Sequence, residues 1–305
     1  PIRCARSKDP ILKPQEEKFL PVLQKWKQFA GGFNFLTANS SVMFGGSLLL
    51  FVATTALLAP ILFTVEHTSM HPIDRLQGPS QAFWFGTDMY GRDTYSRTIF
   101  GCRISLVVGF SVAVLSISIG LVIGLVAGYF RWLDAIVMRI MDGIMAIPGI
   151  LLAIAILALA GASLQTVILA ITIPEIPRVV RLVRGIVLGL REEPYVESAI
   201  SLGTRTSQIL IRHVLPNIVA PLIVQGTYVC ASAMILEAIL SFLGAGVPPE
   251  TPSWGNIMAE GKSYFQIAPW IIFFPGIYLA LTVLGVNVLG DGLRDTLDPR
   301  LAKQL

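Results

Sequence analysis

Six long apolar segments, separated by polar stretches, most constrain how this 305-residue chain can fold. A helix of about 20 apolar residues crosses the ~30 Å hydrocarbon core of a bilayer. Lipid offers no hydrogen-bond partner to exposed backbone groups, so such segments are expected to be helical. The sequence therefore predicts an all-α polytopic membrane protein with six transmembrane helices, at 42–63, 104–130, 136–161, 166–190, 218–243 and 269–289.

The composition points to the same class. Only 14% of the residues are charged, well below the roughly 25% of soluble domains. The three cysteines are far apart and odd in number, which gives neither a disulfide framework nor the spacing of metal ligands. The three histidines are too scattered for a metal cluster, and the net charge of +4 does not indicate nucleic-acid binding. The polar, basic start of the chain lacks the apolar core of a cleaved signal peptide.

The positions of the basic residues predict the orientation. If the amino terminus is cytoplasmic, 18 of the 23 Lys and Arg residues lie on the inner side and five on the outer side. Positive charge favours the cytoplasmic side of a membrane, so both termini are expected inside. The predicted divisions are an amino-terminal arm (1–40), a first transmembrane helix (41–63), an outer loop (64–103), a five-helix core (104–290) that includes the cytoplasmic loop 191–217, and a cytoplasmic tail (291–305).

The cytoplasmic loop has the features of one short amphipathic helix. Pro194 suits the first position of a helix, where its missing N–H costs nothing, and Gly203 can take the positive φ that ends one. Tyr195, Ala199 and Leu202 lie at i, i+4 and i+7, which gives an apolar stripe. The stripe either packs on the chain's own surface or is offered to a partner in water, and the residues alone leave these two interpretations equally open.

Acidic and basic residues are interspersed with glycine before the second predicted span. Both signs of charge are present, so the side chains could hold this loop together through charge-assisted hydrogen bonds. A structural role is therefore favoured over ligand binding. The residues concerned are Gly86, Thr87, Asp88, Gly91, Arg92, Asp93 and Arg97.

Two acidic residues lie within predicted spans, Glu175 in the fourth and Glu237 in the fifth. An acid inside a membrane is costly and needs a partner or water, so both are candidates for lining a path through the membrane. A hydrogen bond between helices is an equal alternative for Glu237, and pairing with Arg178 is favoured for Glu175. Small residues at i, i+4 and i+8 in the second span predict a close helix–helix contact, at Gly120, Gly124 and Gly128.

Several motifs of the chain resemble those of a known family. Glu197-Ser198-Ala199, Gly203 and Leu215-Pro216 are similar to the EAA loop of ABC importer permeases, which reads E-A-A, three residues, G, nine residues and I-x-L-P. Ser198 stands at the first Ala, and His213 at the Ile. The segment 86–97 matches the G-T-D-x-x-G-R-D-x-x-S-R signature of the dipeptide/oligopeptide/nickel subfamily, and 241–255 and 290–300 resemble two further signatures. On this resemblance the coupling helix comprises Pro194, Tyr195, Val196, Glu197, Ser198, Ala199, Leu202 and Gly203, and the loop ends with His213, Leu215, Pro216 and Asn217.

The resemblance implies a fold, a location and a set of partners. It implies the type I ABC importer permease fold and the role of a C-type permease subunit in the bacterial cytoplasmic (inner) membrane. The implied partners are a second homologous permease, two cytoplasmic ATPase subunits and an extracytoplasmic substrate-binding protein, besides the lipid bilayer. Gly261-Lys262-Ser263 is not a phosphate-binding loop, because Asn256 stands where that loop needs glycine. This chain is thus expected to bind no cofactor and to be no enzyme, with ATP and Mg²⁺ held by the ATPase subunits.

The cargo implied by the resemblance is di- or oligopeptides, and nickel, glutathione or opine-like solutes are alternatives within the family. A stand-alone secondary transporter or channel is a rival of a different class, but it leaves the cytoplasmic docking helix unexplained. An integral-membrane enzyme would need catalytic residues gathered at one depth, which three scattered histidines do not provide. Co-purification of an ATPase with this chain distinguishes the importer from both rivals.

Overall fold

The computed structural model describes residues 39–62, 66 and 68–297. These residues are mostly helical, and none of them belongs to a β-strand. Nearly all of the predicted arm 1–40 and the end of the predicted tail, 298–305, lie outside the described residues. The predicted all-α fold is therefore confirmed for the part of the chain that the structure describes.

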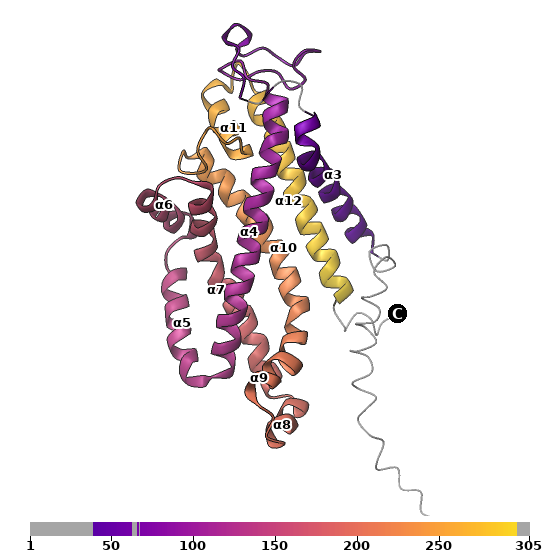
Figure 1. Cartoon of the computed structure of the whole chain (residues 1–305), viewed down its shortest axis with the longest axis vertical. Coiled ribbons are helices and arrows are strands. Elements are labelled where there is room, and N and C mark those ends of the chain that lie inside the picture. The colour runs from indigo at the N-terminus through magenta and orange to yellow at the C-terminus, as the bar shows by residue number, and fades with distance from the viewer. Residues whose placement is uncertain (1–38, 63–65, 67, 298–305) are drawn as a thin grey trace, which may run out of the picture.

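The helices run between two ends of an elongated molecule, which we call the α8 end and the α11 end after the short helix at each (Figure 1). The helices α9, η3 and α10 follow one another without a break, over Thr206–Phe242. In chain order the elements are α3 (Ser40–Leu62), η2 (Pro72–Asp74), α4 (Thr94–Tyr129), α5 (Arg131–Met145), α6 (Gly149–Ala160), α7 (Leu164–Arg191), α8 (Pro194–Ser201), α9 (Thr206–Ile209), η3 (Leu210–Val214), α10 (Leu215–Phe242), α11 (Trp254–Gly261), η4 (Lys262–Tyr264) and α12 (Trp270–Leu297).

The six predicted spans correspond to three kinds of element. Four helical runs are long and apolar enough to cross a membrane: α3, α4, the run that contains α10, and α12. The third predicted span is the pair α5 and α6, bent by 85° at Pro148-Gly149, where proline removes a backbone donor. The fourth is α7, which has 28 residues but carries acidic and basic side chains that set it apart from the apolar helices.

Two boundaries of the predicted spans differ from those of the helices. The outer loop was expected to run to residue 103, but α4 begins at Thr94, where the side chain of Asp93 accepts hydrogen bonds from the first turn. The second and third spans were expected to be separated by residues 131–135, but only Phe130 separates α4 from α5. Hydropathy marks where a helix enters lipid, whereas caps decide where its hydrogen bonding begins. The polar first turn of α4 is therefore helical, whereas α5 begins at Arg131 without a side-chain cap.

The predicted glycine stripe is the contact between α4 and α7. A Cβ atom added at any of its three glycines would lie 2.6–2.7 Å from the Cβ atom of a valine in α7. Such a distance is closer than van der Waals contact allows, so only glycine lets these two backbones approach. The predicted close helix–helix contact is confirmed, and it pairs Gly120 with Val179, Gly124 with Val183 and Gly128 with Val187.

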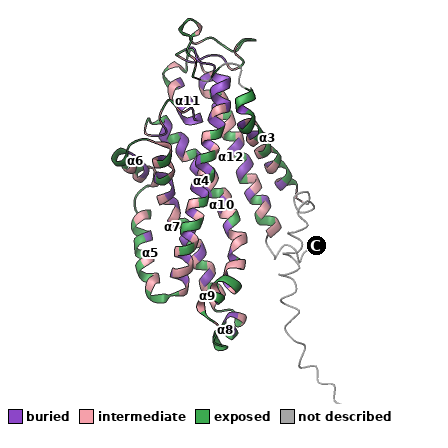
Figure 2. Ribbon diagram, in the orientation of Figure 1, coloured by how far each residue is buried: buried purple, intermediate pink, exposed green. Residues whose placement is uncertain are grey.

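Buried residues gather where α4, α7 and α10 pack together, and the outward faces of the long helices are exposed (Figure 2). Those outward faces are apolar, as at Leu57 and Ile61 of α3 and Phe110 of α4. In water, contiguous apolar surface of this kind would be a liability, whereas lipid solvates it well. The distribution of apolar side chains is thus that of a membrane-embedded bundle.

Candidate functional site

The short helix α8 lies at one tip of the molecule, next to α9, and follows α7 in the chain (Figure 1). It begins with Pro194 in its first turn, after Glu193. Gly203, with φ +75°, reverses the chain behind it. The N–H of Thr204 donates to the carbonyl of Ala199 at 3.1 Å, and that of Gly203 to Ile200 at 2.9 Å. This pattern is the Schellman termination that glycine favours. The predicted helix is confirmed, with Leu202 as its cap.

The two sides of α8 have different partners. Val196 and Ala199 are 0% and 8% exposed and belong to the chain's own main apolar core. Leu202 is 85% exposed, and Ile200 and Glu197 are exposed as well. The predicted stripe of Tyr195, Ala199 and Leu202 therefore does not act as one surface, because Leu202 follows the last helical turn, where the chain changes direction. One face anchors the helix and the opposite face is open.

The last residues of the loop hold α8 in place. The ring of His213 lies 6.3 Å from that of Tyr195, centroid to centroid. The amide of Asn217 donates to the hydroxyl of Tyr195 at 3.5 Å and to the carbonyl of His213 at 2.7 Å. Burial, with the nearby charge of Glu193, raises the pKa of Tyr195, so this side chain stays a neutral hydrogen-bonding group. The two halves of the loop thus form one unit.

The join between the loop and α10 is unusual. The residues Leu210–Val214 form a π-helical turn, and Leu215-Pro216 begins α10 directly after it. Because π-turns often mark functional positions and proline lacks an N–H to continue the ladder, this is a natural point of bending. α8 is thus connected to α7 on one side and, through α9 and the π-helical turn, to α10 on the other.

At the α11 end, the predicted charged loop is a compact buried cluster. The guanidinium groups of Arg92 and Arg97 each lie 2.6 Å from Oδ2 of Asp88. Both also contact Oε2 of Glu260 in α11, at 2.5 Å. Two positive and two negative charges therefore compensate one another within a site that is almost closed to solvent.

The remaining residues of that motif shape the backbone around the cluster. Thr87 donates to the carbonyl of Asp74 and accepts from the N–H of Gln77. Gly86 and Gly91 have φ of +71° and +75°, and a Cβ atom at Gly91 would overlap the carbonyl of His71. The geometry favours the structural interpretation of this motif over ligand binding.

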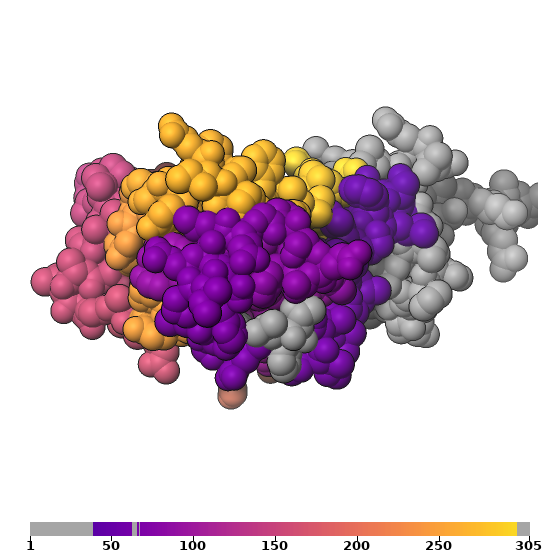
Figure 3. Space-filling view, turned by 90° about the horizontal axis from the view of Figure 1, so that it is seen from above, coloured from indigo at the N-terminus to yellow at the C-terminus, as the bar shows by residue number. Residues whose placement is uncertain are grey.

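Glu260 was not singled out in the sequence, because it lies 163 residues from Arg97 and belongs to no recognisable motif. It connects the signature at 86–97 to α11, whose first residues belong to the signature at 241–255. Trp254, fully buried at the start of α11, donates from its indole N–H to the carbonyl of Thr98 at 3.0 Å. The amide of Asn256 donates to carbonyls of the preceding turn, at Val247, Pro248 and Thr251. Seen from above, these segments form adjoining parts of the α11 end (Figure 3).

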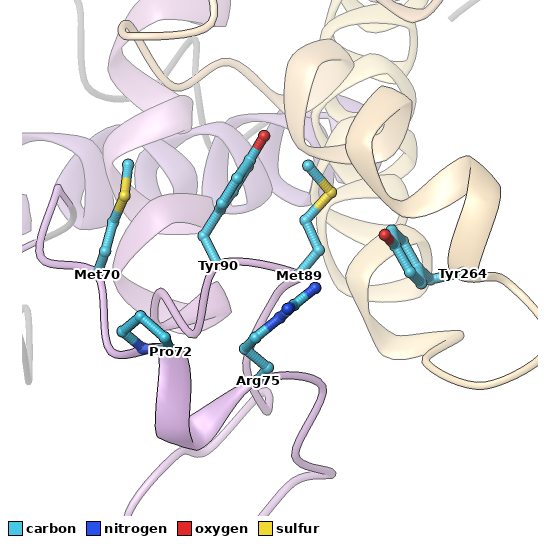
Figure 4. A pocket seen from close by; sticks show the side chains of 6 residues that line it. All are labelled: Met70, Pro72, Arg75, Met89, Tyr90 and Tyr264. Atoms are coloured by element: carbon cyan, nitrogen blue, oxygen red, sulfur yellow. The ribbon is translucent and has the colours of Figure 1, made fainter.

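A shallow hollow of about 220 Å³ opens beside this cluster. Its side chains come from the segment before α4 and, in the case of Tyr264, from η4 (Figure 4). Small-molecule sites commonly enclose about 300–1,000 Å³, so we assign no ligand to it. It is lined by Met70, Pro72, Arg75, Met89, Tyr90 and Tyr264.

The two acids within the spans have different surroundings. Glu237 is fully buried and accepts hydrogen bonds from Ser241 at 2.8 Å and from Ser105 of α4 at 3.4 Å. This arrangement favours the hydrogen bond between helices. Glu175 lies 3.5 Å from Arg178 and accepts from Ser232 of α10 at 3.2 Å. It therefore sits behind an arginine whose side chain reaches the surface.

Comparison with known proteins gives consistent results. Residues 120–303 match the family described as binding-protein-dependent transport system inner membrane component. The chain is 54% identical to a probable peptide ABC transporter permease, y4tQ of Sinorhizobium fredii, over 85% of this chain and 89% of that protein. It is 40% identical to the dipeptide transport system permease DppC of Alkalihalophilus pseudofirmus, over 96% and 95%. It is 43% identical to the glutathione transport system permease GsiD of Pectobacterium atrosepticum, over 90% and 91%.

Solved structures show a similar fold. An inward-facing form of the MetNI methionine ABC transporter aligns with a TM-score of 0.56 at 20% identity, covering 66% of this chain and 97% of the matched one. A second crystal form gives a TM-score of 0.53 at 22% identity, over 65% and 95%. At this level of identity the match concerns the arrangement of helices.

Proposed function

The chain belongs to the family of binding-protein-dependent transport system inner membrane components, and on this premise we propose that it is the permease subunit of an ATP-driven ABC importer of peptides. The proposal rests mainly on α8, a short helix anchored by one face and open on the other. Isolated helices of fewer than about 12–15 residues are marginal in water. Because α8 is anchored by one face, Glu197, Ile200 and Leu202 on its other side are held in a defined place, as a docking surface requires.

The partners follow from the division of labour in such an importer. A second homologous permease completes the transmembrane unit, two cytoplasmic ATPase subunits dock on the coupling helices, and an extracytoplasmic binding protein delivers the solute. This places the α8 end and both termini in the cytoplasm and the α11 end outside, in agreement with the distribution of basic residues. ATP and Mg²⁺ would be held by the ATPase subunits.

The mechanism is alternating access. When the ATPase subunits approach one another, they displace α8, and the contacts of its Tyr195 with His213 and Asn217 make the whole loop move together. The displacement reaches α7 and α10, whose re-packing opens the membrane path to the outside. ATP hydrolysis then returns the helices to their first arrangement.

Peptides are the cargo named for two of the similar proteins, the y4tQ and DppC permeases. Glutathione is a second candidate, because GsiD is 43% identical to this chain over most of both lengths. Both solutes carry peptide bonds and free carboxylates. Competition between a labelled dipeptide and unlabelled glutathione during uptake would distinguish them.

The test is to change the open face of α8 without touching its anchored face. Leu202→Asp places a charge on an apolar contact surface but leaves the chain's own core intact, so we expect the protein to insert normally and to lose ATPase co-purification and peptide uptake together. Ile73→Asp is the matched control, because Ile73 is 95% exposed at the opposite end. Full uptake by Leu202→Asp with the ATPase still bound would contradict the proposal.

A further inference from the structure

Three arginines of α7 form a ladder of ion pairs along one side of the helix. They are spaced three residues apart, so their side chains lie on neighbouring parts of one face. Two of the acidic partners come from α5 and the third from α7 itself. The pairs are Arg184 with Asp134 at 2.7 Å, Arg181 with Asp142 at 2.6 Å, and Arg178 with Glu175 at 3.5 Å.

The ladder reaches the middle of the membrane-spanning bundle. Arg178 lies midway along α7, about 20 Å from either end at 1.5 Å per residue. Its neighbour Val179 packs on Gly120 in the apolar part of α4. Tyr228, midway along α10, lies beside Arg178, with the guanidinium carbon 5.9 Å from the ring centroid. The pair of Arg178 and Glu175 therefore lies at a depth where charged groups avoid lipid.

These charged groups are nevertheless open to their surroundings. The side chain of Arg178 is 46% exposed, and those of Arg181 and Asp142 are 44% and 52% exposed. Exposed charge at this depth requires water or a polar partner, because lipid provides neither. The lipid-facing sides of the bundle are apolar instead, as at Phe110. The exposed face around Arg178, between α5, α7 and α10, therefore borders water or a polar partner.

The guanidinium group of Arg178 also has hydrogen-bonding capacity that its contact with Glu175 does not use. A guanidinium group has five N–H donors in a planar fork that fits a carboxylate. Only one nitrogen of Arg178 contacts Glu175, at 3.5 Å, and that carboxylate also accepts from Ser232. Glu175 is 4% exposed, so it cannot screen the outer side of the arginine. The phenol of Tyr228 adds a second donor at the same place.

We infer that Arg178, with Tyr228 beside it, binds the free carboxylate of the solute as the solute passes along the face of α5, α7 and α10. This inference rests on the proposed importer function and adds the chemical class of its cargo, a carboxylate-bearing peptide. The lower pairs, at Arg181 and Arg184, lie 2.6 and 2.7 Å from their acidic partners, so their positive charge is more closely compensated than that of Arg178, and they line the path without holding the solute.

The first experiment measures the water access and the electrostatic potential at this place, and it does not depend on transport. Tyr228→Cys is made in a chain whose Cys4, Cys102 and Cys230 are replaced by Ala, and the protein is reconstituted in liposomes. Membrane-impermeant thiosulfonates of negative and of positive charge are then compared. The measured quantity is the reaction rate of the negative reagent divided by that of the positive one. We expect this ratio to be about ten times higher for Tyr228→Cys than for a small free thiol, because of the adjacent positive charge.

Two control variants sharpen this measurement. Arg178→Gln in the same background should remove the preference for the negative reagent while the thiol stays reactive. Phe110→Cys, on the lipid-facing side of α4, should react with neither reagent. If Tyr228→Cys is no more reactive than Phe110→Cys, or if the charge preference survives Arg178→Gln, the inference is overturned.

The second experiment measures uptake by the complete importer. Arg178→Gln should raise the KM for a peptide with a free carboxylate about tenfold, the fold-change that one charge-assisted hydrogen bond carries. Arg178→Lys should restore part of the difference, since it keeps the charge but lacks the planar fork. Binding of the peptide to the isolated binding protein is the control, because it does not involve this chain. An unchanged KM in Arg178→Gln would refute the role of Arg178, whereas failure of the unmodified importer to take up peptides would refute the proposed function.

Discussion

The buried ion cluster at the α11 end gives the sharpest test of what holds this fold together. Glu260→Gln removes one negative charge and keeps the shape of the side chain. Asp88 is then the only carboxylate between Arg92 and Arg97 in the described cluster, at 2.6 Å from each. All three of these side chains are less than one tenth exposed, so water cannot replace the missing charge.

The expected cost follows from that geometry. Removing one partner of a buried ion pair destabilises a protein by about 3–5 kcal/mol, because an uncompensated charge remains. Coulomb's law gives a similar size, about 4 kcal/mol for two charges 4 Å apart at an effective dielectric constant of 20. Glu260 itself is 15% exposed, which places the expectation at the lower end, about 3 kcal/mol. Restoring neutrality with Arg97→Gln in the same chain should recover part of this loss.

The assay is thermal unfolding of the purified chain in detergent, followed with a thiol-reactive fluorescent dye. Cys102 is fully buried, so its reaction reports the opening of the bundle. Glu250→Gln is the matched control, because this exposed acid lies in the same region of the chain and forms no ion pair among those the structure describes. If Glu260→Gln unfolds at the same temperature as Glu250→Gln, or if the Arg97→Gln double variant loses the full sum of both single effects, the cluster does not stabilise the protein through charge compensation.

Three further predictions concern packing, orientation and α8. Gly124→Leu should overpack the α4–α7 contact, at a cost of about 1–3 kcal/mol, and so lower the amount of folded protein. Gly143→Leu should be tolerated because open space surrounds it. Equal yields of the two variants in fluorescence-detected gel filtration would contradict this prediction. A reporter fused after Leu305 should read cytoplasmic and one inserted at Glu250 external, and the opposite result for both would refute the orientation. Ala199→Asp should reduce the thermal stability of the isolated chain as well as ATPase attachment, because Ala199 packs in the chain's own core. An unchanged unfolding temperature would show that burial of this face does not stabilise the chain.

Local properties of the sequence determined most of the helical framework. Apolar runs gave the positions of the spans, because lipid permits only backbones that satisfy their own hydrogen bonds. Pro194 and Gly203 bounded α8 correctly, since fixed φ and positive φ are properties of single residues. The glycine stripe of α4 was readable as a close contact, because the spacing i, i+4, i+8 defines one face of a helix whatever its partner.

The tertiary structure decided what those elements touch. Only the packed bundle showed that Ala199 faces the core while Leu202 faces outward, because the direction of the chain after α8 depends on where α9 and α10 lie. Only the bundle brought Glu260 to Arg97 and placed α7 against α5, contacts between residues too far apart in the chain for any local pattern to predict. Hydropathy, caps and spacing are short-range properties, whereas compensation of buried charge depends on which helices become neighbours.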